Sequence, residues 1–342
     1  MMKVKMLFVL LASLLLITGC TQTEEDPKQP SEKTKTTKNS EQKYPLTGIS
    51  TNEDIDRRAI AVTINNHPKA RPQTGLADAD IVYELLAEAN ITRFLAVYQS
   101  TWPEEVGPIR SARDYFIELA KGLDCIYVCH GNSPDAKTML ANNYIEALNG
   151  LKYDGTLFTR SNDRKAPHNS YITFANIEKG AEQNSFDLTG APEPFSFLSE
   201  EKTGKLAGDE ALSARVSYGN SSYNASYEYD EEAGKYQRYS DGEQTIEAEV
   251  QTPILLDNLL IIEAPHKVID NEGRRNIDLT AGGNGYLLQK GKVNEIQWVN
   301  KNGRIVPMID GTEAGLITGK TWVNVVPADP GLEATVTLNA KE

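Results

Sequence analysis

The stretch Ser111-Ala-Arg-Asp-Tyr-Phe-Ile-Glu-Leu-Ala-Lys-Gly-Leu-Asp-Cys-Ile-Tyr-Val-Cys-His-Gly-Asn-Ser-Pro-Asp135 shows the clearest succession of helix and strand signals in the chain. Its first part, residues 111–121, predicts a helix. Ser111 suits the N-cap, Asp114 completes a capping-box pattern, and Gly122 is a typical stop. Aromatic and aliphatic residues at helical spacing would form the buried stripe of this helix.

The second part of the stretch predicts a buried strand and another helix. Residues 125–129 are an apolar run of strand length. Ser133 is an N-cap followed by proline at the first helical position, so a helix is expected from there to about Leu148. Strands are also expected at 58–65 and on either side of Ala89-Asn90 within 80–100, with a helix as the alternative for 85–87. This mixture predicts an α/β domain for residues 45–190.

Composition changes after residue 190. Residues 191–213 are typical of a linker, and the chain from 214 to 330 has short alternating segments separated by turn residues. We expect strands at 215–218, 225–229, 236–239, 254–263, 285–289, 295–299 and 321–326. The predicted fold class is therefore α+β, with a layered α/β N-terminal domain and a mostly β C-terminal domain.

The N-terminus has the pattern of a bacterial lipoprotein precursor. Lys3 and Lys5 precede a short apolar run that ends at Ile17-Thr-Gly-Cys20, the lipobox pattern. We expect residues 1–19 to be a signal peptide and Cys20 to carry lipid (palmitate among the acyl chains), which anchors the protein on the extracytoplasmic face of the cell membrane. An ordinary signal peptide with an incidental cysteine is the alternative. Residues 20–44 are polar and predict a flexible tether.

The charge of the chain limits its partners. Formal net charge is −13, and removing residues 1–19 takes away two lysines and no acids, which leaves 33 − 48 = −15. Direct binding to nucleic acid or to anionic headgroups requires a basic surface and is not expected. A local basic pocket remains compatible with this charge.

The cysteines do not predict chemistry. Cys125 and Cys129 lie four residues apart on a predicted strand, roughly 13 Å, which is too far for a disulfide. We expect two buried free thiols. A metal site at Cys129-His130 lacks further spaced ligands, so neither a metal nor a cofactor is expected.

Basic residues gathered around a helix start suggest an anion-binding pocket. Arg110 and Arg113 flank the predicted N-terminus, where the helix dipole disfavours a cation unless an anion compensates. That anion could be an internal carboxylate or a bound ligand. The loop at 159–171 adds three basic residues, together with His168 and Asn169. The candidate ligand-binding residues are Arg110, Arg113, Arg160, Arg164, His168 and Asn169.

Four motifs resemble one known family. Asn65-Asn-His-Pro-Lys-Ala-Arg-Pro-Gln-Thr-Gly-Leu76, Gly107-Pro-Ile-Arg-Ser-Ala-Arg113, Pro167-His-Asn-Ser-Tyr171 and Gly319-Lys-Thr-Trp-Val-Asn324 are similar to those of the YerB-like bacterial lipoproteins. This resemblance covers about residues 44–330. It implies a surface lipoprotein of a Gram-positive cell, built from paired N- and C-terminal domains of unknown function. It supplies no assigned catalytic residues.

Three functions are compatible with these observations. The first is a non-enzymatic binding protein at the membrane–wall interface that holds an anionic wall component, such as a polymer phosphate or a peptide carboxylate. The second is an extracytoplasmic enzyme acting on an anionic or glycan substrate, with His168 as acid or base. The third is a protein-interaction scaffold that offers an edge strand of its β-rich part to another protein. We favour the first, since standard catalytic signatures are missing from the sequence.

Overall fold

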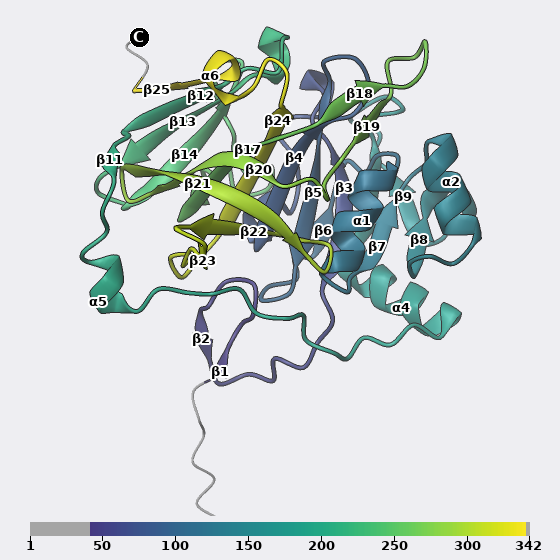
Figure 1. Ribbon diagram of the computed structural model, residues 1–342. Coiled ribbons are helices and arrows are strands. Elements are labelled where there is room, and N and C mark those ends of the chain that lie inside the picture. The colour runs from purple at the N-terminus through teal and green to yellow at the C-terminus, as the bar shows by residue number, and fades with distance from the viewer. Residues whose placement is uncertain (1–41, 340–342) are drawn as a thin grey trace, which may run out of the picture. The chain divides into compact units, whose positions relative to one another are not determined.

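The computed structural model describes residues 42–339, and its largest element is a mixed 12-stranded sheet (Figure 1). The strands follow the order β23-β22-β21-β20-β17-β24-β4-β5-β3-β7-β8, and β11 pairs with β21. In chain order these strands are β3 (Ile60–Asn65), β4 (Ile81–Leu86), β5 (Thr92–Tyr98), β7 (Ile126–Cys129), β8 (Ala147–Asn149), β11 (Asp209–Glu210), β17 (Asn258–Ala264), β20 (Gly283–Gln289), β21 (Lys292–Lys301), β22 (Arg304–Ile309), β23 (Thr312–Glu313) and β24 (Thr321–Pro327).

Smaller sheets surround this one. A six-stranded antiparallel sheet contains β12 (Ser213–Val216), β13 (Ala225–Asp230), β14 (Lys235–Ser240), β15 (Glu243–Gln244), β16 (Leu255–Leu256) and β25 (Val336–Leu338). A three-stranded sheet contains β6 (Glu105–Val106), β9 (Phe158–Arg160) and β10 (Ser170–Thr173). Two-stranded sheets pair β1 (Gln42–Lys43) with β2 (Ser50–Thr51), and β18 (His266–Val268) with β19 (Arg275–Ile277). The fold is α+β, as the sequence predicted.

Strand β24 connects the two parts of the chain within the large sheet. It pairs in parallel with β17 on one side and with β4 on the other, so Asn324 lies opposite both Ile261 and Glu84. β4 belongs to the predicted first domain, whereas β17 and β24 belong to the predicted second. The division of the chain at 191–213 stays a prediction, and strands from both sides of it share one sheet.

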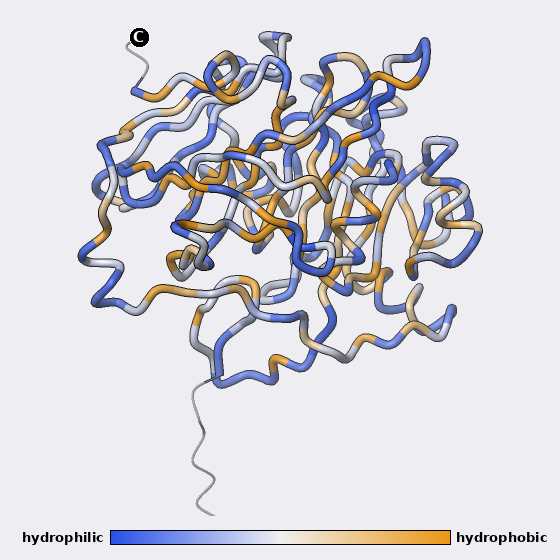
Figure 2. The backbone as a smooth tube through the Cα atoms, in the orientation of Figure 1, coloured by the Kyte–Doolittle hydropathy of each residue, from blue (hydrophilic) through white to orange (hydrophobic). Residues whose placement is uncertain are grey.

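Two sets of buried side chains cover the opposite faces of the large sheet. Successive side chains of a strand point to opposite faces of the sheet. Val62 of β3 therefore belongs to one set, and its neighbour Ala61 belongs to the other. Phe116 of helix α1 (Asp114–Gly122) packs with the set of Ala61. Tyr227 of the six-stranded sheet and Phe174 of helix α4 (Phe174–Asn184) pack with the set of Val62. Figure 2 shows hydrophobic residues recurring along these central strands.

The first predicted helix is present, but it starts later than the sequence suggested. Helix α1 spans Asp114–Gly122, and its N-cap is Arg113. Ser111 does not cap it, since the Ser111 hydroxyl donates to the carbonyl of His130 at 3.3 Å. The chain is still extended at Ala112, whose N–H donates to the Gly131 carbonyl at 2.9 Å. Pairing with the loop after β7 therefore delays the helix, and the prediction of Ser111 as the N-cap was wrong.

The second predicted helix starts where the sequence predicted, but it ends several residues before the predicted position. Helix α2 spans Pro134–Ala141, and the Ser133 hydroxyl accepts from the Ala136 N–H at 3.3 Å, as expected for the N-cap. Asn143 then adopts a left-handed conformation with φ 52°. Residues Ala147–Asn149 form β8 beside β7, so the predicted helix end near Leu148 was wrong.

The remaining helices are short, apart from α4. They are α3 (Gly150–Tyr153), α4 (Phe174–Asn184), α5 (Glu200–Thr203) and α6 (Leu332–Thr335), with 3-10 turns η1 (Pro68–Ala70), η2 (Leu76–Asp78) and η3 (Ser221–Tyr223). Within residues 42–339, no helix is both long enough and apolar enough to cross a membrane.

Candidate functional site

Three loops meet at the end of β3. They are residues 65–73 after β3, residues 107–113 before α1, and residues 160–169 between β9 and β10, and each contains one cis X–Pro bond. Backbone hydrogen bonds hold the loops together, among them the one from Asn65 N to the Pro108 carbonyl at 2.8 Å. Two of the loops were predicted to carry ligand-binding residues, and the structure brings them side by side.

The amide of Asn65 sets the orientation of His168. Asn65 is buried, and its Oδ1 accepts from the backbone N–H of His67 at 3.0 Å. That contact assigns the amide oxygen, so the Asn65 Nδ2 donates to His168 Nδ1 at 2.9 Å. Because Nδ1 accepts, the hydrogen of the neutral His168 ring lies on Nε2.

His67 adopts the same tautomer and stacks on His168. Its Nδ1 accepts from the backbone N–H of Lys69 at 3.1 Å, which places the ring hydrogen on Nε2. The ring centroids of the two histidines are 4.4 Å apart, with an interplanar angle of 30°. Within the described part of the chain, neither Nε2 has a hydrogen-bond partner. The pair therefore presents two N–H donors without protein acceptors.

The surroundings of both imidazoles favour the neutral form. Burial lowers the pKa of His67 below its ordinary value of 6.5, and the charges of Lys69 and Arg71 lower it further. Burial also lowers the pKa of His168, with additional contributions from His67 and Arg110. The surroundings of this pair are positive, although the whole chain carries −13.

Arg110 is the arginine of this cluster that lacks a side-chain partner among residues 42–339. Its backbone is held on both sides, by the hydrogen bond from Arg110 N to the Thr63 carbonyl at 2.9 Å and by that from His130 N to the Arg110 carbonyl at 2.9 Å. Its half-buried guanidinium makes no hydrogen bond or ion pair with any residue of 42–339. Burial lowers the pKa of Arg110, while the charge of Glu88 raises it.

Glu88 binds the other two arginines of the neighbourhood. Its Oε1 lies 2.8 Å from an Arg113 guanidinium nitrogen and 2.5 Å from one of Arg93. Burial alone would raise the pKa of Glu88, but the adjacent guanidinium groups hold it below its usual range. Two cations share one carboxylate here, so this group leaves a net positive charge behind Arg110. For Arg113, the compensating anion is therefore an internal carboxylate, which is one of the two possibilities that the sequence allowed.

Arg160 and Asn169 belong to a separate polar group around His130. Arg160 pairs with Asp154 at 2.9 Å and donates to the Asn169 Oδ1 at 3.2 Å. A further N–H of Arg160 donates to His130 Nε2 at 2.9 Å, so the His130 Nδ1–H donates to the Ser170 hydroxyl at 2.7 Å. These contacts satisfy the Arg160 charge within the protein.

Arg164 braces two of the loops. Its guanidinium donates to the carbonyls of Ala70 at 2.9 Å and Pro72 at 2.7 Å, and to the Tyr171 hydroxyl at 2.9 Å. Of the six predicted ligand-binding residues, Arg110 and His168 have donors without acceptors among residues 42–339, and the charge of Arg110 lowers the pKa of His168. The other four, Arg113, Arg160, Arg164 and Asn169, are engaged by protein groups.

Residues outside the predicted set complete the cluster. His67 forms one half of the histidine stack, and Tyr223 of η3 lies edge-on to it at 6.4 Å between centroids. Arg71 lies over the Tyr223 ring at 5.8 Å and donates to the Ser222 carbonyl at 2.6 Å. The polar Asn-Asn-His-Pro sequence directly after a strand was a signal for His67. Tyr223 had no such signal, since it is remote in sequence.

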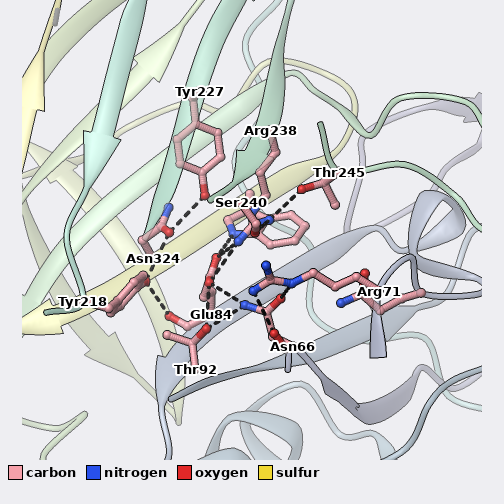
Figure 3. Close-up of polar contacts among 12 residues, drawn as sticks. Asn66, Arg71, Glu84, Thr92, Tyr218, Tyr227, Arg238, Ser240, Thr245 and Asn324 are labelled. Carbon is pink, nitrogen blue, oxygen red and sulfur yellow. Dashed lines mark hydrogen bonds and ion pairs between the residues drawn. The ribbon is translucent and has the colours of Figure 1, made fainter. Parts of the chain in front are cut away.

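A buried ion pair holds the second sheet against the loop that carries His67 (Figure 3). Glu84 of β4 and Arg238 of β14 are both fully buried, and one Arg238 nitrogen lies 3.0 and 2.8 Å from the two Glu84 oxygens. The Asn66 amide donates to Glu84 at 3.3 Å, and Trp322 Nε1 donates to it at 3.2 Å. Beside Arg71 and Arg238 lies a cavity of about 150 Å³. The site therefore depends on both parts of the chain.

Residues 42–339 give little support for thiol chemistry or for a metal site. Cys125 and Cys129 are buried and free, as predicted, and burial raises the pKa of Cys129 to about 12, which makes thiolate chemistry unfavourable. No group of three or more potential metal ligands is found within that range. The predicted signal peptide, Cys20 and nearly all of the predicted tether lie outside the described residues.

The chain belongs to the family described as protein of unknown function DUF3048. Residues 46–187 match its N-terminal domain, and residues 214–323 match its C-terminal domain. The chain is 47% identical over 288 residues to the "Putative lipoprotein YerB" of Bacillus subtilis (strain 168), covering 83% of this chain and 86% of that protein. It is also similar to the crystal structure of YerB from Bacillus subtilis, with a TM-score of 0.81 and 46% identity, covering 87% of this chain and all of that one. The YerB-like resemblance seen in the sequence is thereby confirmed.

Proposed function

We propose that this protein is a membrane-anchored lipoprotein on the extracytoplasmic face of the cell, which binds an anionic group of the cell wall at Arg110, His67 and His168. The lipobox ending at Cys20 and the name of the Bacillus subtilis relative support the anchor. One observation carries the binding proposal: the stacked His67–His168 pair presents two Nε2–H donors without acceptors among residues 42–339, and the unpartnered Arg110 lies near enough for its charge to lower the pKa of both rings. Phosphate and carboxylate oxygens are the acceptors that such donors fit.

The tautomer of His168 favours binding over general-base catalysis. A general base needs a free lone pair on the nitrogen that faces its substrate. His168 Nδ1 accepts from Asn65, and its Nε2 carries the hydrogen in the neutral ring. The free nitrogen therefore donates, which suits an anion and not a substrate proton. We propose a binding protein rather than an enzyme for this reason.

Calorimetric titration with phosphate-bearing wall fragments and with inorganic phosphate tests this proposal. Arg110→Ala is expected to weaken binding by at least about tenfold, because a charge-assisted hydrogen bond contributes about 1.5–3 kcal/mol. Lys165→Ala is the matched control. Lys165 is exposed in the same group of loops, and its side chain makes no hydrogen bond or ion pair within residues 42–339, so this variant should bind as the parent does. Equal heats for the parent and Arg110→Ala, or no heat with any fragment, would refute the site.

The two histidines predict how binding depends on pH. Sulfate is a suitable probe, since it keeps its charge through the titration range of histidine. Sulfate affinity should rise by about tenfold as the pH falls through the lowered pKa values of the two rings and they protonate, and it should change little at a pH well above them. The sign follows from linkage: the bound anion favours the protonated ring and raises its pKa, so binding takes up protons.

Glutamine variants give the control for the pH experiment. His67→Gln and His168→Gln each keep a donor but cannot gain a charge, so each should flatten the pH profile while retaining the affinity seen at neutral pH. Lys69 and Arg71, which face His67, and Arg164, which faces His168, keep their charge over this range. An affinity that stays level or falls with acidification would contradict the role of the histidines.

A further inference from the structure

A second hollow lies beside α1. It has a volume of about 690 Å³ and lies between α1, α2 and the segment that follows β19. β19 packs against α1, so the two elements form its walls (Figure 1). None of the residues discussed above as anion ligands lines it. We call it the α1–β19 groove.

The floor of the α1–β19 groove is apolar. The side chains that form it are Leu119, Met139, Tyr144, Ile277 and Leu279. Met139 is half-buried, and Tyr144 has a relative exposure of 37%, which makes it one of the exposed large hydrophobic residues of the described chain. Apolar surface left accessible beside a concave hollow is typical of a surface that another molecule covers.

The rim of the groove is acidic, and Lys121 lies at its Tyr144 end, with its Nζ 4.3 Å from the centroid of the Tyr144 ring. Its carboxylates are Asp114, Glu118, Asp135 and Asp278. No lysine or arginine lines the groove, and none of these four carboxylates forms an ion pair with a residue of 42–339. The hydroxyl of Tyr144 donates to Glu118, and Asp278 accepts from the Thr280 hydroxyl, so both contacts are with neutral groups.

We propose that the α1–β19 groove binds a segment of another protein that carries lysine or arginine beside large apolar side chains. The apolar floor takes the apolar side chains, and the rim pairs with the cations. A membrane surface is a poor occupant, because four carboxylates repel anionic headgroups. A metal ion is a poor occupant as well, since the described residues hold no cluster of potential metal ligands here.

The state of Asp114 agrees with a cationic occupant. Burial raises the pKa of its carboxyl group, and the nearby charge of Asp135 raises it further. A cation between these two groups relieves the repulsion. The inference is independent of the anion site, which lies in other loops and attracts the opposite charge.

Methionine methyl NMR can test this proposal, because the chain has one reporter in the groove and one elsewhere. Of the five methionines, Met139 and Met308 lie among residues 42–339. Met308 lines a different hollow of about 780 Å³, which also contains acidic residues such as Glu295 and Asp310. It therefore reports nonspecific attraction to negative surface. The probe is an amphipathic peptide of leucine and lysine, and the control peptide has glutamate in place of lysine.

Addition of the leucine–lysine peptide should shift the methyl signal of Met139 and leave that of Met308 in place. In the double variant Glu118→Gln/Asp135→Asn, the dissociation constant should rise about fivefold at low salt, as expected for the loss of two exposed charge contacts. Both residues are exposed, and glutamine keeps an acceptor for Tyr144. Glu178→Gln/Glu182→Gln removes two exposed carboxylates from α4 and should leave the dissociation constant unchanged.

Three results would overturn the proposal. They are equal shifts at Met139 and Met308, a Met139 shift that the glutamate peptide reproduces, and an affinity that the groove variant and the α4 variant share. Calorimetric unfolding of each variant establishes that the fold is retained, so a loss of binding cannot be assigned to unfolding.

Discussion

Replacement of Arg238 by methionine is expected to lower the free energy of unfolding by about 3–5 kcal/mol. The variant leaves Glu84 fully buried without its cation. The Asn66, Thr92 and Trp322 donors remain, but they are neutral and compensate only part of the lost interaction. Urea denaturation followed by tryptophan fluorescence measures the change.

Two further variants separate the ion pair from the loss of packing. Arg215→Met makes the same substitution on an exposed residue of β12 and should change stability by less than about 0.5 kcal/mol. The double variant Glu84→Leu/Arg238→Met removes both charges and should be more stable than Arg238→Met alone, since no unpaired charge stays buried. If the single variant is as stable as the parent, or the double variant is no better than the single, the pair does not have the assigned role.

Truncation of the chain after Gly190 is expected to prevent stable folding of the remaining part. The truncated chain lacks β24, so β4 becomes an edge strand whose six residues are all buried in the intact protein. It also lacks Arg238 and Trp322, which contact Glu84. An apolar edge strand with an unpaired buried carboxylate favours aggregation over a monomeric fold.

Thermal unfolding followed by circular dichroism measures this effect. The full chain should unfold in one cooperative transition of its folded part, and the truncated chain should show no cooperative transition or should precipitate. A monomeric, cooperatively unfolding fragment would establish residues 45–190 as an independent domain. Two separate transitions in the full chain would lead to the same conclusion.

The local sequence predicted elements well where short-range physics decides them. Ser133 caps α2 because its hydroxyl reaches an N–H three residues away, and no distant group competes for it. Strands β4 and β5, on the two sides of Ala89, were predicted because residues 80–100 are rich in apolar side chains and Ala89-Asn90 interrupts them. The start of α1 was missed because Ala112 pairs with the loop after β7, a contact that sequence spacing does not show.

The sequence likewise predicted some features of the candidate site and missed others. Basic residues in loops were visible in the sequence, so Arg110 and His168 were among the predicted ligands. Which arginines have free donors depends on where the carboxylates lie, and Glu88 and Asp154 occupy Arg113 and Arg160 through contacts between separate segments. The orientation of His168 depends on Asn65, 103 residues away.

The sequence by itself determined the class of fold, the expected lipid anchor at Cys20, and a basic cluster in an acidic chain, because composition, short motifs and periodicity encode these properties locally. The tertiary structure alone decided that β24 lies beside β4, that His67 stacks on His168, and that Arg110 has no side-chain partner among residues 42–339. These features arise from contacts between residues far apart in the chain. Each depends on which groups pack together once the sheet has formed, and no local pattern specifies that choice.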